Sequence, residues 1–310
     1  MSSDLLQWIV FNVFVIIMLA LDLGVFNKTP HEVKPKEALL WTVIWIAQAL
    51  VFNIGLYYWQ GAEPALQFLT GYVIEKSLSV DNIFVFLVIF SYFRVEAQYQ
   101  HKVLFWGIIG ALVMRGIFIA VGVALLEKFD WIIYVFGGFL VLTGIKFGLQ
   151  KNKEIDPGTN PLLKLVRKIV PVTDEFINGN FFVKIDGRLF ATPLFIVLIA
   201  IETTDVVFAV DSIPAILSIT TDPFIVYTSN VFALLGLRAL FFAVASMMRL
   251  FHYLQYGLGV ILAFIGVKMM LATIYKIPVG IALAVIAGVL VISVVFSVMW
   301  PPKEEASANG

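Results

Sequence analysis

Carboxylates interrupt two long apolar segments of this 310-residue chain. The first interruption, at residues 74–83, reads IEKSLSVDNI, and the second, at 201–214, reads IETTDVVFAVDSIP. Carboxylate, amide and hydroxyl oxygens are hard ligands, which suit Mn²⁺, Ca²⁺ or Mg²⁺ better than copper or zinc. The metal ligands that we predict are Glu75, Asp81, Asn82, Glu202, Asp205 and Asp211.

The spacing of these acids limits which of them can share a site. Glu202 and Asp205 are three residues apart and lie on one face of a helix. Glu75 and Asp81 are six apart, which turns them roughly 240° from each other on a regular helix. Either the helix unwinds locally at the intervening serines, or the two acids have different partners. Asp211 has the same offset from Asp205, just ahead of a proline that can end or kink the helix.

Basic residues occur in the same apolar segments. A charge at the bilayer centre costs about 2.5 to 3.5 kcal/mol on insertion scales, so each one is a functional candidate. A cation pathway has little use for additional cations, so the basic residues are interpreted as structural. The alternative for the acids is that they too only form buried ion pairs and bind no metal. Asp22 is either a partner for one base or part of the site. The residues interpreted as supporting ion pairs are Asp22, Lys76, Arg115, Lys146, Arg238 and Lys268.

The composition places these charges in a membrane. Hydrophobic residues make up 61% of the chain, charged residues only 14%, and the mean hydropathy is +0.96, far from the values of soluble domains. The formal net charge is zero, which argues against nucleic-acid binding. Cysteine is absent, so thiolate ligands and thiol redox chemistry are excluded within this chain. We find no catalytic or cofactor-binding motif and expect neither an enzyme nor a prosthetic group.

Nine apolar segments are long enough to span a bilayer. They predict an all-α polytopic transmembrane bundle, a single domain over residues 1–310. Lys and Arg concentrate in alternate loops, which predicts that the N-terminus is outside and the C-terminus cytoplasmic. The predicted spans are 8–26, 37–59, 65–93, 103–126, 130–149, 193–217, 224–248, 255–275 and 278–300.

The longest loop, 151–192, is predicted to be cytoplasmic. Residues 161–170 alternate apolar and basic residues at helical spacing, which is typical of a helix on the membrane surface or of a solvated linker. Asp186-Gly187 separates two short apolar runs and predicts a β-hairpin.

Two stretches of three spans each, 65–150 and 193–275, match at an offset of 122 to 124 residues. An odd number of spans makes the second stretch an inverted copy of the first. Inverted repeats are typical of transporters, in which the substrate binds near the midplane between copies that rock against each other. The main matches are 79–84 with 203–208, 111–115 with 233–238 after one inserted residue, and Tyr134, Gly137, Gly144 and Lys146 with Tyr256, Gly259, Gly266 and Lys268.

These motifs resemble the TerC family of bacterial membrane proteins, particularly its Alx-like branch. The resemblance lies in residues 71–82, 201–214 and 221–238 and extends over nearly the whole chain. Where the family has Glu-x-Ser-Asp, this chain has Glu202-Thr-Thr-Asp205. The resemblance implies an inner-membrane protein related to the LysE group of exporters, associated with manganese efflux and, in some members, with tellurite resistance.

We therefore expect a divalent-cation transporter that exports Mn²⁺ by alternating access, with protons competing for the carboxylates. One alternative is a membrane factor that loads metal into exported proteins or assembles them. Another is an oxyanion transporter, for tellurite or a similar ion, which would rely on Arg115 and Arg238. The expected partners are the metal ion, protons and the lipid bilayer, and the sequence leaves a homo-oligomer or other membrane-protein partners open.

Overall fold

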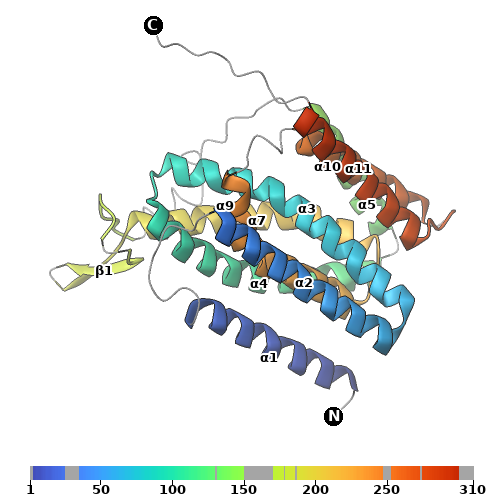
Figure 1. Ribbon diagram of the computed structural model, residues 1–310, viewed down its shortest axis with the longest axis horizontal. Coiled ribbons are helices and arrows are strands. Elements are labelled where there is room, and N and C mark those ends of the chain that lie inside the picture. Colours follow the sequence, from blue (N-terminus) through green and yellow to red (C-terminus); the bar gives the residue numbers. More distant parts are fainter. Residues whose placement is uncertain are drawn as a thin grey trace, which may run out of the picture.

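The computed structural model describes residues 3–24, 35–129, 131–149, 170–177, 179–185, 187–246, 253–272 and 274–299 (Figure 1). Nearly all of them are helical, which confirms the predicted polytopic helical bundle. The helices are α1 Ser3–Gly24, α2 Pro35–Gln60, α3 Ala62–Tyr92, α4 Ala97–Lys128, α5 Ile132–Leu149, α7 Pro193–Leu217, α8 Pro223–Leu235, α9 Leu237–Ser246, α10 Leu254–Leu271 and α11 Val279–Met299.

Each predicted span corresponds to one of these helices or to the α8–α9 pair. Among the described residues, α2, α4, α7 and α11 are long and apolar enough to cross a membrane individually, and α8 with α9 passes as a bent pair. Helices α1, α5 and α10 contain shorter apolar stretches. Helix α3 has 31 residues and carries the first predicted ligand motif.

Helices α3, α4, α7 and α8 meet in the centre of the bundle. Helix α3 packs on both α7 and α8, and α4 packs on the same two helices. Helices α5, α10 and α11 are grouped on one side, while α1 lies on the opposite side against α8 (Figure 1). The centre is therefore formed by the first two helices of each predicted repeat.

Helices α5 and α10 pack through glycines that let their backbones approach closely. A Cβ atom on Gly144 would lie 2.5 Å from the Gly259 carbonyl oxygen, and one on Gly266 would lie 2.5 Å from that of Gly137. The earlier glycine of each helix faces the later glycine of the other, so the two helices run antiparallel. Such reciprocal contacts are what a two-fold relation between two copies produces.

The span predicted at 224–248 is divided in the structure. Gly236 separates α8 from α9, and the two helices are bent by 44°. A Cβ atom at Gly236 would lie 2.6 Å from Lys76 Nζ and 3.0 Å from Trp45 Cβ, so a side chain here would displace the Lys76 ammonium and press on Trp45. Gly236 lies within 233–238, which has one residue more than its match 111–115 in the first copy of the predicted repeat.

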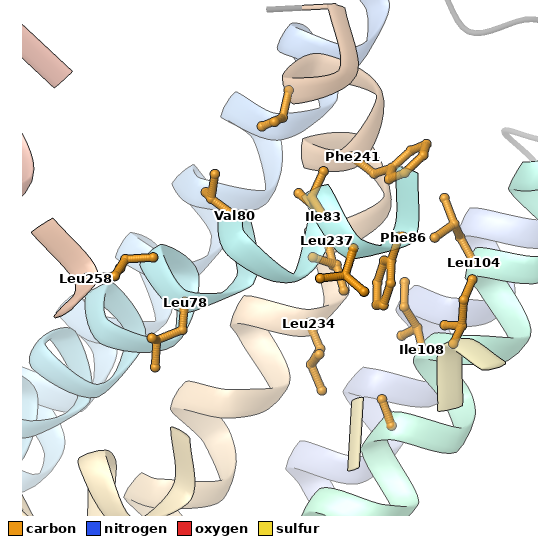
Figure 2. Close-up of a cluster of buried hydrophobic side chains, with 14 of the residues drawn as sticks. Leu78, Val80, Ile83, Phe86, Leu104, Ile108, Leu234, Leu237, Phe241 and Leu258 are labelled. Atoms are coloured by element: carbon orange, nitrogen blue, oxygen red, sulfur yellow. The ribbon is translucent and has the colours of Figure 1, made fainter. Parts of the chain in front are cut away.

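Apolar side chains fill the bundle on one side of the central helices (Figure 2). Figure 2 shows this closing cluster, contributed by α3, α4, α8, α9 and α10. It lies towards the α3–α4 connection, the end that the charge distribution predicts to be cytoplasmic. Its labelled members are Leu78, Val80, Ile83, Phe86, Leu104, Ile108, Leu234, Leu237, Phe241 and Leu258.

A small hairpin precedes α7, as predicted. Strand β1 Phe182–Ile185 pairs antiparallel with β2 Arg188–Ala191. Gly187 in the turn has φ of 77°, a conformation that favours glycine. The helix predicted at 161–170 lies almost entirely outside the described residues.

Candidate cation site in the centre of the bundle

Arg115 of α4 is buried at the centre, with 1% of its surface exposed. Its guanidinium forms ion pairs with Glu75 of α3 and Asp205 of α7. The Asp205 contact has two bonds, from Nε to Oδ2 at 3.3 Å and from Nη2 to Oδ1 at 3.2 Å. Nη1 also donates to Ser212 Oγ at 3.3 Å and to Asn230 Oδ1 at 2.9 Å. Three helices thus supply oxygen acceptors to one cation.

The helices position these groups through regular spacing. Asp205 and Ser212 are seven residues apart on α7, two turns along the same face. Asn230 of α8 donates from its own amide nitrogen to the Val226 carbonyl oxygen at 3.1 Å, which leaves Oδ1 directed at Arg115. The planar guanidinium suits this arrangement because its donors form a rigid fork that can bind a carboxylate through two bonds.

The Arg115 cluster has more negative than positive charge. One guanidinium faces two carboxylates, so the ionised cluster carries a formal charge of −1. Glu75 is fully buried, and its Oε2 atom has no hydrogen-bond partner among the described residues. Leaving a buried acceptor unpaired costs about 1 to 3 kcal/mol, and more when the group is charged. The cluster therefore has both the charge and the open acceptor that a cation or proton needs.

A small cavity lies beside Asp205. Its volume is about 10 Å³, which is close to the minimum for one water molecule. The remaining lining is apolar and comes from α3, α4, α7 and α9, including Phe86 and Leu237 of the closing cluster. An ion at Asp205 would have to separate these apolar side chains to leave on that side.

Two other predicted ligands lie on α7. Glu202 is half-buried one turn before Asp205 and lies against α4, where a Cβ atom on Gly110 would come within 2.0 Å of its Oε1. Asp211 faces α5 instead, and Thr143 Oγ1 donates to its Oδ1 at 3.4 Å. The structure thus places Glu202 next to Asp205 and directs Asp211 away from the Arg115 cluster.

Of the two alternatives for Glu75 and Asp81, local unwinding of α3 does not occur. The helix is continuous from Ala62 to Tyr92, and Ser77 Oγ donates to the Val73 carbonyl oxygen within it. Asn82 is buried on this helix. The side chains of Asp81 and Asp22 lie outside the described residues, so their predicted roles stay predictions.

Two of the predicted ion-pair lysines contact backbone oxygens, and their predicted ion pairs stay predictions. Lys76 Nζ donates to the Ala233 carbonyl oxygen at 3.2 Å, near the end of α8, and Lys268 Nζ donates to that of Ser218 at 2.7 Å, at the end of α7. Both positions suit a cation because helix carboxyl ends carry partial negative charge. Lys146 is exposed on α5, and Arg238 is buried at the start of α9.

Asp81, one of the six predicted ligands, has a side chain outside the described part of the chain, so the ligand set as a whole stays a prediction. Among the side chains that the structure describes, no group of three or more His, Asp or Glu is placed to hold a metal ion. Sequence reasoning also missed Ser212 and Asn230 as partners of Arg115. Both were visible as polar residues inside apolar helices, but helical spacing alone does not tell which faces meet.

These features define a polytopic membrane protein with a transporter-like helical core and a buried charge cluster. The chain belongs to the TerC family of integral membrane proteins, whose sequence model matches residues 60–305. No solved structure matches the chain.

Relatives cover nearly the full chain. An uncharacterized membrane protein of Myxococcus xanthus is 54% identical over 292 residues, 94% of this chain and 92% of the relative. A protein of Escherichia coli K12 named "Putative membrane-bound redox modulator Alx" is 48% identical over 301 residues, 94% of each chain. An uncharacterized membrane protein of Rickettsia bellii is 42% identical over 294 residues, 95% of this chain and 97% of the relative.

Proposed function

We propose that this protein is a divalent-cation transporter that exports Mn²⁺ across the bacterial inner membrane by alternating access, with protons as the counter-ion. The observation that carries the proposal is the meeting of Glu75 and Asp205 at Arg115, with Glu75 Oε2 left open. A buried cluster with an uncompensated negative charge has a clear use in a cation pathway. Intramembrane carboxylates are otherwise costly.

The Arg115 cluster offers the ligand chemistry of a hard cation. Carboxylate, hydroxyl and amide oxygens surround the guanidinium, and these are the donors that Mn²⁺ accepts. A divalent cation that arrives beside Glu75 would compete with Arg115 for the same two carboxylates. In this proposal the Arg115 guanidinium pairs with the two carboxylates when no metal ion is bound, and releases them when the metal ion binds.

The closing cluster supplies the barrier that alternating access requires. With the N-terminus outside, as the charge distribution predicts, this cluster would separate the Arg115 cluster from the cytoplasmic ends of α3 and α4. Opening to the cytoplasm would then separate α3 and α4 from α9. The described conformation corresponds to the inward-closed state of this cycle.

Proton coupling follows from the ligand chemistry. Carboxylates bind a metal ion only when deprotonated, so protons and Mn²⁺ compete for them. The open oxygen of Glu75 is the site where either cation would be accommodated. The protein would release the metal ion on the outside and return to its original conformation with a proton bound. This cycle would need no nucleotide.

An oxyanion cargo fits the arrangement less well. Both sides of the Arg115 guanidinium are already occupied by Glu75 and Asp205, so an anion would have to displace two buried carboxylates. The name of the Escherichia coli relative refers to redox modulation. This chain has no cysteine, so any such role here would not use thiols of the chain itself.

The proposal is tested with purified protein in liposomes containing a Mn²⁺-quenched dye. We expect saturable Mn²⁺ flux with the wild type, and a loss of at least tenfold with Glu75→Gln or Asp205→Asn. Glu63→Gln is the matched control, because it makes the same change at an exposed position on α3. Wild-type flux in both buried variants would exclude this site.

A further inference from the structure

Three buried oxygens lie on one face of α3. Tyr72, Glu75 and Ser79 are spaced by three and four residues, which places them within roughly 60° of each other around the helix axis and spreads them over about 10 Å along it. Their exposed fractions are 5%, 0% and 0%. Glu75 is the middle member and belongs to the Arg115 cluster, so this oxygen face of α3 runs through the candidate cation site.

Each of these side chains has an oxygen without a hydrogen-bond partner among the described residues: Tyr72 Oη, Glu75 Oε2 and Ser79 Oγ. Two other hydroxyls of α3 are satisfied by the helix itself. Thr70 donates to the Leu66 carbonyl oxygen and Ser77 to that of Val73. Ser79 could donate to the carbonyl one turn back in the same way but does not, so its hydroxyl remains free for another ligand.

Packing holds the Tyr72 ring independently of its hydroxyl. The ring stacks on Phe68 at a centroid distance of 6.3 Å and an angle of 6°, within the aromatic cluster around Phe232. The hydroxyl is therefore presented by a fixed ring and adds no bond that stabilises this packing. An unpaired buried hydroxyl costs about 1 to 3 kcal/mol, and a ligand that needs an oxygen offsets that cost.

We infer that the oxygen face of α3 lines the route of the cation, with the Tyr72 and Ser79 hydroxyls as ligands on either side of Glu75. The inference rests on the proposed function and extends it to two residues that bear no charge. A hard cation moving along α3 would pass from one oxygen to the next in steps of about one helical turn, 5 to 6 Å. Ser79 leads towards the closing cluster, and Tyr72 leads towards the opposite end of α3.

Removing the hydroxyls separates this role from a structural one. Tyr72→Phe and Ser79→Ala each delete an oxygen that has no bond to lose, so both variants should unfold at or above the wild-type temperature. If the oxygens are ligands, Mn²⁺ flux in liposomes should nevertheless fall about tenfold, which corresponds to about 1.4 kcal/mol in the transport barrier.

The matched controls change hydroxyls that already have partners. Ser77→Ala removes a hydroxyl bonded within α3, and Tyr227→Phe removes one that donates to Asn12 Oδ1 at 3.1 Å. Both should retain wild-type flux. If the wild type transports Mn²⁺ and Tyr72→Phe and Ser79→Ala transport it equally well, the inference is overturned while the proposed function stands.

A second measurement does not depend on transport. Because the chain lacks cysteine, Ser79→Cys and Ser77→Cys each introduce a single thiol. In membrane vesicles, a small water-soluble thiol reagent should label Ser79→Cys faster than Ser77→Cys, and Mn²⁺ should slow the labelling. Equal labelling of the two variants would contradict the route, and absence of wild-type Mn²⁺ flux would reject the proposed function separately.

Discussion

Arg115 and Asp205 are joined by two hydrogen bonds between α4 and α7, at 3.3 and 3.2 Å, in the buried centre of the bundle. A pair with this geometry fixes the rotation of both helices. The same guanidinium binds Glu75 of α3, so it is the common contact of three helices. Its removal should affect both folding and transport, and the two effects can be separated.

Arg115→Ala should destabilise the protein by about 3 to 5 kcal/mol, because it leaves two carboxylates buried without a partner. Thermal unfolding in detergent measures this loss, with the exposed Lys146→Ala as control. A triple variant, Arg115→Met with Glu75→Gln and Asp205→Asn, should recover most of the stability and still show no Mn²⁺ flux. A triple variant that transports would contradict the assignment of this cluster to the cation.

Gly110→Ala tests Glu202 as a ligand. An added methyl group would lie 2.0 Å from Glu202 Oε1, the far end of a flexible side chain that can move away at little cost. We expect nearly wild-type stability. The barrier to Mn²⁺ transport should rise by roughly 1 kcal/mol, which lowers the flux about fivefold. Gly116→Ala on the same helix makes only an ordinary contact, 3.7 Å from Tyr227, and should leave flux unchanged. Equal flux in the two variants would mean that Glu202 is not a ligand.

Gly144→Ala tests the close packing of α5 on α10. The new Cβ would lie 2.5 Å from the Gly259 carbonyl oxygen, a backbone atom that cannot turn aside, so the helices must separate. Overpacking of this kind costs about 1 to 3 kcal/mol. Gly138→Ala on the same helix meets open space and should be neutral or stabilising. Gly144→Ala should therefore unfold at a lower temperature than Gly138→Ala.

Proton coupling predicts a pH change inside the liposomes. Mn²⁺ moving inwards should drive protons outwards, so a trapped pH dye should report alkalinisation with the wild type and none with Asp205→Asn. Acidifying the side from which Mn²⁺ binds should slow the flux, because protonated carboxylates do not bind metal. Mn²⁺ flux without any pH change would leave transport intact and remove the proton from the mechanism.

The sequence predicted the spans well because their length and apolarity are set by the bilayer. It predicted the hairpin because Asp186-Gly187 suits a two-residue turn. Span length, apolarity and turn type are local properties, which follow from the hydrophobic periodicity and composition of a single segment.

Contacts between helices could not be derived in this way. Nothing in the spacing of Asn230 indicates that its amide oxygen meets Arg115, 115 residues earlier. The α8–α9 break lies within 233–238, where the second repeat has one residue more than the first, but the sequence predicted one unbroken span there. Its meaning depended on the approach of Lys76 from another helix.

Glu75 and Lys76 are consecutive residues of α3 that contact different parts of the bundle. Glu75 binds the Arg115 guanidinium, and Lys76 binds the carbonyl oxygen of Ala233 beside the divided helix. One peptide bond joins the two, so α3 cannot turn or slide at one contact without disturbing the other. The charge balance of the centre and the angle between α8 and α9 are thereby linked mechanically. A change of ligand at Glu75 would be transmitted as a movement of the bent pair.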